Sequence, residues 1–263
     1  MQHRPKRSLG QNFLRDVSVS QRIVDALDLQ SDDQVIEIGP GQGALTEGLI
    51  ACDANVTAIE FDRDLAPSLR ERFVTSERLK VIEADALDVD FASVIHPSSF
   101  DTHLSLKLVA NLPYNISTPI LQRLIDQRAV FSTLVLMFQR EVIERIIAEP
   151  GNKARGYLSV IAQSAFEVEY LFDVPPTAFY PVPKVWSSVI RLRPNPFNDD
   201  EQRFKKVISQ AFMQKRKTLA NNLSRYYPNV ADAISNAGLA EKVRAEQLSL
   251  DDWRQLLEAL NAL

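Results

Sequence analysis

The chain has 263 residues, which fits one large domain or one α/β domain with a small appendage. Hydrophobic residues make up 45% and charged residues 24%, ordinary values for a soluble folded protein. The single cysteine, Cys52, excludes an internal disulfide, argues against a cysteine-based metal cluster and suits a reducing cytoplasm. The basic N-terminus precedes no apolar signal region, and apolar runs such as Leu134–Phe138 are too short to cross a bilayer. We therefore expect a cytoplasmic protein with no metal and no membrane segment.

The net charge of −4 argues mildly against nucleic acid, but the charge is unevenly distributed. The stretch from Asp32 to Asp101 is acidic, whereas residues 202–231 contain no acid. The basic block of this second stretch consists of Arg203, Lys205, Lys206, Lys215, Arg216, Lys217 and Arg225. Such asymmetry indicates an RNA-contacting surface, and a solvated helix face is the alternative.

The first two-thirds of the chain alternate apolar strands with amphipathic helices. After a basic arm that runs through Leu14, Ser18 or Ser20 is expected to cap a first helix. Strands are expected at residues 35–38, 56–59, 79–82, 105–110, 133–138, 169–172 and 185–192. Helices are expected at residues 44–50, 65–73, 120–124, 141–147 and 157–166. This alternation predicts βαβ units and a largely parallel, doubly wound sheet.

The pattern changes near residue 194, where Pro194 and Pro196 predict a linker. Apolar residues then recur at helical spacing, Gly238 is a helix stop signal, and Ser249 with Asp252 resembles a capping box. We therefore predict an α/β domain over residues 1–193 and a small all-helical domain over residues 194–263.

A glycine turn, Gly39-Pro-Gly41-Gln-Gly43, follows the first strand of the expected sheet and opens a helix. Glycines let the backbone turn sharply and approach a ligand closely. No Gly-Lys-Ser/Thr follows, so this is not a phosphate loop. Glu60 ends the second strand, where an acid can accept both hydrogen bonds of a ribose diol. This arrangement serves NAD and S-adenosylmethionine equally well, and a purely structural turn is the alternative.

Asp85 follows the third strand at the same expected edge of the sheet. Its carboxylate can accept a hydrogen bond from the amine of a cofactor adenine. A helix N-cap is the alternative role. Three successive strand ends therefore carry groups suited to one cofactor.

The sequence Asn111-Leu112-Pro113-Tyr114 follows the fourth strand. An adenine amine is a poor nucleophile because its lone pair is delocalised into the ring. The Asn111 side-chain oxygen and the Leu112 carbonyl can each accept one N–H of such an amine, and Tyr114 can stack on the base. A turn with a buried tyrosine is the alternative. His3, His96 and His103 have no metal-ligand spacing, and no Ser-His-Asp or Cys-His arrangement is present.

These motifs resemble the ribosomal RNA adenine dimethyltransferase family over almost the whole chain. The resemblance is carried by Gly10-Gln-Asn-Phe-Leu14, Glu37–Gly43, Glu60, Asp85, Asn111–Tyr114, Phe179–Ser188 and the helical end around residues 248–260. It is strongest to the bacterial small-subunit branch. It implies a Rossmann-like class I methyltransferase domain, four methyl transfers from S-adenosylmethionine, and two adjacent adenosines near the 3′ end of 16S rRNA as substrate.

The resemblance also implies roles for individual residues. Asn12 and Leu14 would fold over the cofactor, and Gly39 would approach its methionine end. Asn111 would lie between the cofactor and the target base, and Phe179 would sandwich that base with Tyr114. The partner would be the small ribosomal subunit, and we expect a monomer.

Three other functions remain open from the sequence. A macrolide-resistance type of large-subunit methyltransferase would share the fold and the cofactor. A non-enzymatic assembly or transcription factor would have no need of intact Glu60, Asp85 and Asn111. An NAD dehydrogenase would share the glycine turn but has no use for Asn111–Tyr114.

Overall fold

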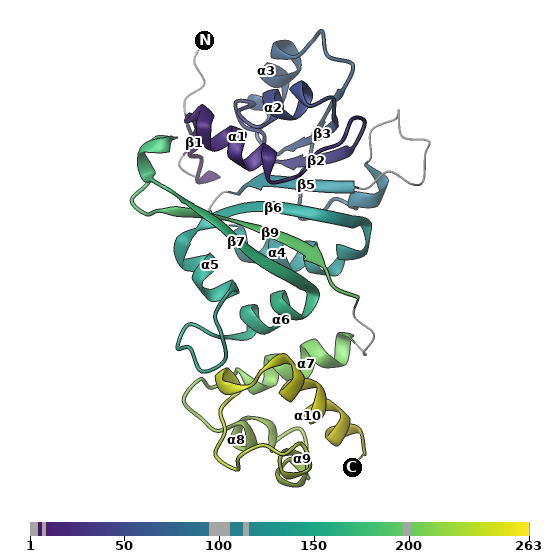
Figure 1. Ribbon diagram of the computed structural model, residues 1–263, viewed down its shortest axis with the longest axis vertical. Coiled ribbons are helices and arrows are strands. Elements are labelled where there is room, and N and C mark those ends of the chain that lie inside the picture. Colours follow the sequence, from purple (N-terminus) through teal and green to yellow (C-terminus); the bar gives the residue numbers. More distant parts are fainter. Residues whose placement is uncertain (1–4, 7–8, 95–105, 113–115, 197–200, 263) are drawn as a thin grey trace. The chain divides into compact units, whose positions relative to one another are not determined.

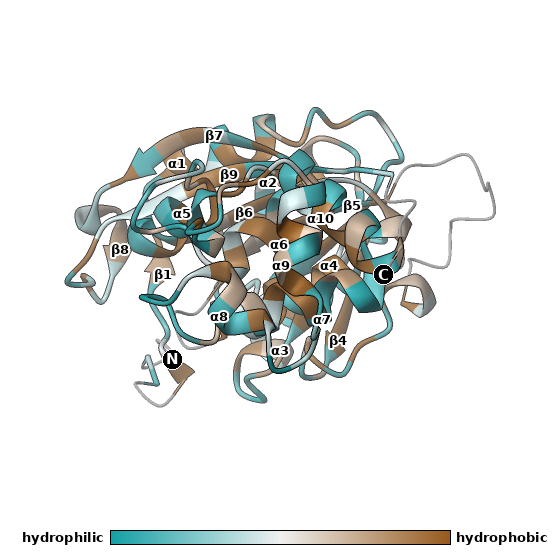
Figure 2. Ribbon diagram, turned by 90° about the horizontal axis from the view of Figure 1, so that it is seen from below, coloured by the Kyte–Doolittle hydropathy of each residue, from teal (hydrophilic) through white to brown (hydrophobic). Residues whose placement is uncertain are grey.

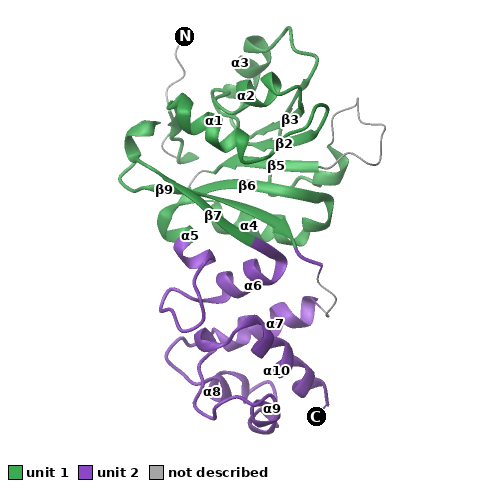
Figure 3. Cartoon of the chain, in the orientation of Figure 1, with its two compact units in different colours: residues 1–143, 168–194 green, residues 144–167, 195–263 purple. Residues whose placement is uncertain are grey.

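The computed structural model describes residues 5–6, 9–94, 106–112, 116–196 and 201–262. The chain divides into two compact units, Met1–Ile143 with Val168–Pro194, and Glu144–Glu167 with Asn195–Leu263 (Figure 3). The sequence-based division after residue 193 lies next to the break at Pro194. It differs from the structure for residues 144–167, which group with the C-terminal helices because the helix in this segment packs on two of them.

The first unit is built on a seven-stranded sheet of order β4-β3-β2-β5-β6-β9-β7 (Figure 1). Strands β2 to β6 pair in parallel, and β9 runs antiparallel to β6. A two-stranded antiparallel ladder of β1 (Phe13–Leu14) and β8 (Phe179–Tyr180) lies apart from the large sheet. The large sheet contains β2 (Gln34–Ile38), β3 (Asn55–Glu60), β4 (Leu79–Glu83), β5 (Leu106–Asn111), β6 (Phe131–Gln139), β7 (Phe166–Val174) and β9 (Ser187–Pro194).

Helices cover the sheet of the first unit. Every residue of β2 and β3 is buried, as expected for parallel strands covered on both faces. One hydrophobic core joins α1, α2 and the inner strands through side chains such as Ile23, Leu49 and Val56. The helices that begin in this unit are α1 (Val17–Asp25), α2 (Thr46–Ala51), α3 (Leu65–Arg72), α4 (Ser117–Asp126) and α5 (Arg140–Ile146), with short 3₁₀ turns η2 (Phe91–Ser93), η3 (Arg128–Val130) and η4 (Pro176–Ala178).

The cap of α1 corrects the sequence analysis. Asp16 is the N-cap, and its Oδ1 accepts hydrogen bonds from the backbone N–H groups of Ser18 at 2.9 Å and Val19 at 3.3 Å. The predicted caps are wrong because Ser18 and Ser20 already lie inside the helix, and the Ser18 hydroxyl donates to the same Asp16 oxygen. Asp16, two residues before Ser18, therefore accepts hydrogen bonds from backbone N–H groups that have no partner within the helix.

The second unit is helical, as the spacing of apolar residues predicts. Gly238 has φ +68 after α9, which confirms the predicted helix stop. Ser249 and Asp252 exchange backbone and side-chain hydrogen bonds at the start of α10, which confirms the capping box. Hydrophobic and hydrophilic residues alternate along helices such as α7 and α10 (Figure 2). The elements are α6 (Tyr157–Ala165), α7 (Glu201–Ala211), α8 (Leu219–Leu223), α9 (Val230–Asn236), η5 (Ala245–Gln247) and α10 (Leu250–Ala262).

Each strand and helix expected from the sequence has a counterpart, with ends that differ by a few residues. The short strands β1 and β8 were not expected, because two residues carry no readable periodicity. Within the described ranges, no helix combines the length and the apolar character that a membrane span requires.

The Asp16 cap gives a first test. We expect Asp16→Ala to lower the free energy of unfolding by about 1 kcal/mol, because two backbone donors lose their acceptor. Asp16→Asn keeps an oxygen acceptor and serves as the matched control, with a smaller loss. Urea denaturation measures both variants. Equal stabilities of the alanine variant and the wild type would contradict the assignment of the cap.

Candidate functional site

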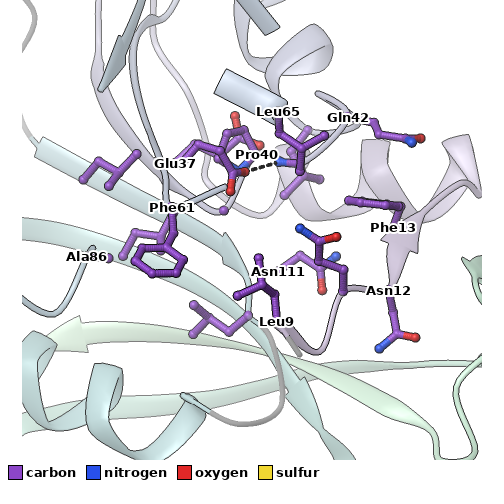
Figure 4. Close-up of a pocket in the computed structure, with 18 of the residues that line it drawn as sticks. Leu9, Asn12, Phe13, Glu37, Pro40, Gln42, Phe61, Leu65, Ala86 and Asn111 are labelled. Carbon is purple, nitrogen blue, oxygen red and sulfur yellow. Dashed lines mark hydrogen bonds between the residues drawn. The ribbon is translucent and has the colours of Figure 1, made fainter. Parts of the chain in front are cut away.

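A pocket lies at the carboxyl ends of β2, β3, β4 and β5 in the first unit (Figure 4). The parallel register brings these strand ends together, since Ile38 is paired with both Ile59 and Ala110, and Glu60 with Glu83. The pocket contains every described residue that the sequence analysis selected for the cofactor or the chemistry, namely Asn12, Leu14, Gly39, Glu60, Asp85, Asn111, Leu112 and Phe179. Pro113 and Tyr114 lie outside the described residues.

The glycine turn between β2 and α2 forms one wall of the pocket. Gly39, Gly41 and Gly43 all have positive φ, from +57 to +83. A Cβ on Gly41 would lie 3.0 Å from the Phe13 ring of the arm, and a Cβ on Gly43 would lie 2.8 Å from the Phe73 ring. Only glycine therefore combines this backbone shape with close packing on both sides.

Glu60 lies at the end of β3 with its carboxylate held by backbone donors. Its Oε2 accepts from Gly41 N at 3.0 Å, and its Oε1 accepts from Asp62 N at 2.8 Å. Burial raises the pKa of Glu60, and these two hydrogen bonds oppose that rise. Each carboxylate oxygen can accept a further hydrogen bond, so the fixed carboxylate can still hold a ligand diol.

Asp85 lies in the turn after β4, where no helix begins, so it is not the helix N-cap that the sequence offered as an alternative. Its Oδ1 accepts from Leu87 N at 2.9 Å, so the side chain closes the turn after β4. Among the described residues this is the one hydrogen bond at the carboxylate, and Asp85 also lines the pocket. The second carboxylate oxygen of Asp85 is therefore compatible with a ligand. The hydrogen bond from Leu87 N to Oδ1 orients the carboxylate.

The N-terminal arm is fixed beside Glu60 by contacts that the sequence analysis missed. Lys6 Nζ pairs with Asp62 Oδ1 at 2.5 Å and with Asp64 at 2.6 Å, and Gln11 Nε2 donates to Asp62 Oδ2 at 2.7 Å. Burial alone would raise the pKa of Asp62, yet the Lys6 ammonium and the N–H of Asp64 hold it below its ordinary value. Asp62 follows Glu60 by two residues. This pair of closely spaced acids was the sequence signal that could have indicated a partner for the basic arm.

Asn111, Leu112 and Phe179 also line the pocket. Asn111 is the last residue of β5, and the backbone N–H of Leu112 donates to Met137 O at 3.3 Å. Phe179 is 4% exposed and pairs with Leu14 in the register of the β1–β8 ladder. The arm and the segment after β7 therefore reach the same pocket from one small ladder. Figure 4 shows the arm residues Asn12 and Phe13 beside Asn111 at the end of β5.

Glu37 is a buried acid of the pocket to which the sequence analysis gave no role of its own. Its Oε2 accepts from the Thr46 hydroxyl at 2.6 Å, and the side chain is 1% exposed. Burial raises the pKa of Glu37 to about 7, the Thr46 hydrogen bond lowers it, and the nearby Glu60 raises it further. The buried carboxyl group therefore binds a proton below neutral pH.

The basic block of the second unit divides into two parts. Arg203 donates to Leu260 O at 3.3 Å, and Lys205 pairs with Glu201 at 2.7 Å, so both serve contacts within the unit. The block's exposed members are Lys206, Lys215, Arg216, Lys217 and Arg225. In the arm, Lys6 is paired as described, and Arg4 and Arg7 lie outside the described residues. In the described part of the chain, no group of three acids, histidines or cysteines could hold a metal ion.

Solved structures place this combination of sheet and pocket among the Rossmann-like methyltransferases. The chain is similar to a dimethyladenosine transferase from Plasmodium falciparum, with 27% identity, a TM-score of 0.82, and coverage of 95% of this chain and 98% of the other. It is also similar to the 23S rRNA methyltransferase ErmE, with 29% identity, a TM-score of 0.73, and coverage of 95% and 100%.

The chain belongs to the ribosomal RNA adenine dimethylase family, whose model matches residues 2–262. Two relatives are named ribosomal RNA small subunit methyltransferase A. The protein from Hahella chejuensis is 41% identical over 97% of this chain and 93% of its own length. The protein from Syntrophotalea carbinolica is 43% identical over 99% and 98%. The chain is therefore an enzyme of the methyltransferase class, and the dehydrogenase and non-enzymatic alternatives are set aside.

The buried Glu37 gives a prediction about pH. A pKa near 7 in the folded chain, against an ordinary value of 4.5, means that the folded state binds more protons than the unfolded state between these values. The free energy of unfolding should therefore fall as the pH rises through this window, by on the order of 3 kcal/mol. Glu37→Gln removes the titrating group and should remove this fall.

The comparison uses denaturant unfolding of both proteins at several pH values between 4.5 and 8. Glu77→Gln is the control, because the Glu77 side chain is exposed. If the wild type and Glu37→Gln show the same dependence on pH, Glu37 is ionised throughout and the cause assigned to its pKa is wrong.

Proposed function

We propose that this enzyme transfers methyl groups from S-adenosylmethionine to the N6 amines of two adjacent adenosines near the 3′ end of small-subunit rRNA, during small-subunit biogenesis. The observation that carries the proposal is the single pocket that gathers Gly39, Glu60, Asp85 and Asn111 from four strand ends. The names of the relatives support the small subunit as the partner.

The residues of the pocket fit the proposed cofactor. Glu60 would hold the ribose diol, with its carboxylate oriented by Gly41 N and Asp62 N. Asp85 would accept from the adenine amine through the oxygen that does not close its turn. Gly39 has φ +68 and offers backbone without a side chain where the methionine end would lie. Asn12 and Leu14 would cover the cofactor from the arm.

On the target side, Asn111 and Leu112 would accept the two N–H groups of an adenine amine. This interaction fixes the amine and favours a lone pair that is directed out of the ring plane. The buried end of β5 holds Asn111, and Leu112 is held by its own hydrogen bond to β6. Tyr114 and Phe179 are proposed to stack on the base, and the ladder to β1 positions Phe179.

The cofactor supplies a methyl group already activated by bonding to a positively charged sulfur. The protein therefore needs no covalent intermediate, and its contribution is to align the amine with that methyl group. No nucleophilic serine or cysteine lines the pocket among the described residues. This agrees with a reaction in which the cofactor supplies the activated methyl group and the protein only aligns the amine. The surplus proton of the amine can leave to solvent after transfer.

The exposed members of the basic block are proposed to contact RNA phosphates. They lie in a stretch without acids, whereas Arg203 and Lys205 serve the unit's own structure.

We further propose a cytoplasmic monomer, since its substrate would be a cytoplasmic RNA particle. Methylation of large-subunit RNA instead would follow the similarity to ErmE. An assay with labelled cofactor and isolated small and large subunits decides between the two.

The role of Glu60 predicts a change in cofactor affinity. Replacing a charged acceptor should cost about 1.5–3 kcal/mol, so Glu60→Ala should weaken binding of S-adenosylmethionine by roughly ten- to a hundred-fold. Calorimetry measures the dissociation constant. Glu83→Ala is the matched control, because Glu83 is the register partner of Glu60 on β4 but does not line the pocket. A folded Glu60→Ala enzyme with wild-type affinity would exclude this role.

The roles of Asn111 and Phe179 predict separable kinetic effects. Asn111→Ala should slow the first methylation while cofactor affinity changes little, because its oxygen acts on the target amine. The monomethylated amine has one N–H left, so stacking must then hold the base, at roughly 1–3 kcal/mol per face. Because Phe179 is also buried, Phe179→Leu is the suitable variant, and it should slow the second methylation more than the first.

Mass spectrometry of the RNA over a time course counts the mono- and dimethylated products. Normal dimethylation by Asn111→Ala would rule out the proposed role of Asn111. An unchanged ratio of mono- to dimethylated product in Phe179→Leu would remove stacking by Phe179 as the cause of the second step.

A further inference from the structure

A second pocket lies within the helical unit, where the segment before α6 meets the turn after α7. It is lined by Arg145, Arg155, Tyr157, Phe212 and Lys215, among others, and shares no lining residue with the cofactor pocket. Three of these five side chains are cationic and two are aromatic. Lys215 belongs to the basic block, whereas Arg145 and Arg155 precede that block by many residues in the sequence.

Arg155 is the unusual residue of this pocket. Its side chain is 1% exposed, and Nη1 donates to Ala148 O at 2.6 Å and to Gln163 Oε1 at 2.7 Å. Its buried Nε has no hydrogen-bond partner, and no carboxylate of the described residues forms an ion pair with the guanidinium. A buried cation whose acceptors are all neutral is costly unless an anion joins it.

The surroundings of Arg155 favour an anion from several directions. Gly156 caps α6 and Tyr157 begins it, so the positive end of this nine-residue helix borders the pocket. Lys215 also lines the pocket, and its Nζ donates to Lys153 O at 2.6 Å, which ties the two segments together. Burial lowers the pKa of Arg155, and the carboxylate of Glu149 raises it through its charge alone, since it forms no ion pair with the guanidinium.

The aromatic wall points to a nucleotide rather than to a bare anion. Tyr157 and Phe212 are both partly exposed, and the Phe212 ring lies against Trp253 with a centroid distance of 6.1 Å. An aromatic ring fixed in this way can support a base next to a bound phosphate. An acidic peptide would satisfy the cations but would leave these rings without a matching group.

We propose that this pocket binds a phosphodiester of an RNA strand through Arg155 and Lys215, with the adjoining base against Tyr157 and Phe212. The inference rests on the proposed function for its RNA partner and deepens it by joining Lys215 of the basic block to Arg155 and two aromatic rings outside that block. The phosphate supplies the anion that the buried guanidinium lacks. The exposed cations Arg216 and Lys217 follow Lys215 directly, so the backbone of the strand can continue along them.

The experiment measures the affinity of the full chain for small ribosomal subunits that lack the methyl groups, over a range of salt concentrations. Arg155→Gln should weaken binding about tenfold or more. It should also lower the slope of log affinity against log salt by about 0.7–0.9, the value for one lost phosphate contact. Lys215→Gln should act in the same direction. Arg254→Gln, which removes a cation of α10 paired with Asp251, is the matched control and should leave the slope unchanged.

A folded Arg155→Gln with an unchanged slope would overturn the proposal and make Arg155 a purely structural residue. Hydrogen exchange of the wild type gives a reading that does not depend on whether the variants fold. A short single-stranded RNA should slow exchange of the backbone amides at residues 154–158, and no change there would also overturn the proposal. Slowing by an acidic peptide but not by RNA would assign the pocket to a protein partner instead.

Failure of the proposed function gives a different result. In that case the wild type transfers no methyl group to small-subunit RNA, whatever the state of this pocket. If the wild type methylates small-subunit RNA but the Arg155 and Lys215 variants leave the salt slope unchanged, only the proposal about this pocket is contradicted.

Discussion

The parallel pairing of β2 with both β3 and β5 is the constraint on which the site depends. In this register the chain leaves each strand at the same edge, so residues far apart in sequence, such as Gly39, Glu60 and Asn111, reach one pocket. The buried faces of β2 and β3 hold these ends in place, because a slip of one residue would exchange the two faces of a strand. The residues of the site are therefore supplied by strand ends and the turns that follow them, and the core beneath fixes their positions.

Several acidic side chains lie at this same edge of the sheet, and each of them is held by a different kind of hydrogen-bond donor. Backbone N–H groups hold Glu60, an ammonium and an amide from the arm hold Asp62, and a threonine hydroxyl holds Glu37. Three buried or half-buried carboxyl groups so close together would repel one another if all were charged and unsupported. Lys6 therefore has a structural role in the arm.

The sequence predicted most of the elements and that residues such as Glu60, Asp85 and Asn111 gather at one edge of the sheet, because strand ends and glycine turns are local signals with a fixed meaning in a parallel sheet. It did not predict the Asp16 cap, where the serines nearby were equally plausible from spacing alone. It did not group residues 144–167 with the C-terminal helices, since that depends on packing between distant segments. Arg155 was also missed, because an arginine in sequence carries no sign of being buried without a carboxylate. The grouping of residues 144–167 and the burial of Arg155 depend on contacts that exist only after the chain has folded.

The ladder of β1 and β8 has a consequence for the pace of the reaction. It joins Phe13 and Leu14 to Phe179 and Tyr180, and the contacts of Lys6 and Gln11 with Asp62 fasten the arm at a second point. The seven-stranded sheet is a separate ladder, but Leu14 and Phe179 also pack into the hydrophobic core of its strands β2 and β3. An enzyme that modifies one RNA repeatedly must discard spent cofactor and reload between transfers. Lifting the arm would break its ion pairs and expose Leu14 as well as open the ladder, so reloading would cost a local opening that still leaves the strand pairing of the large sheet in place.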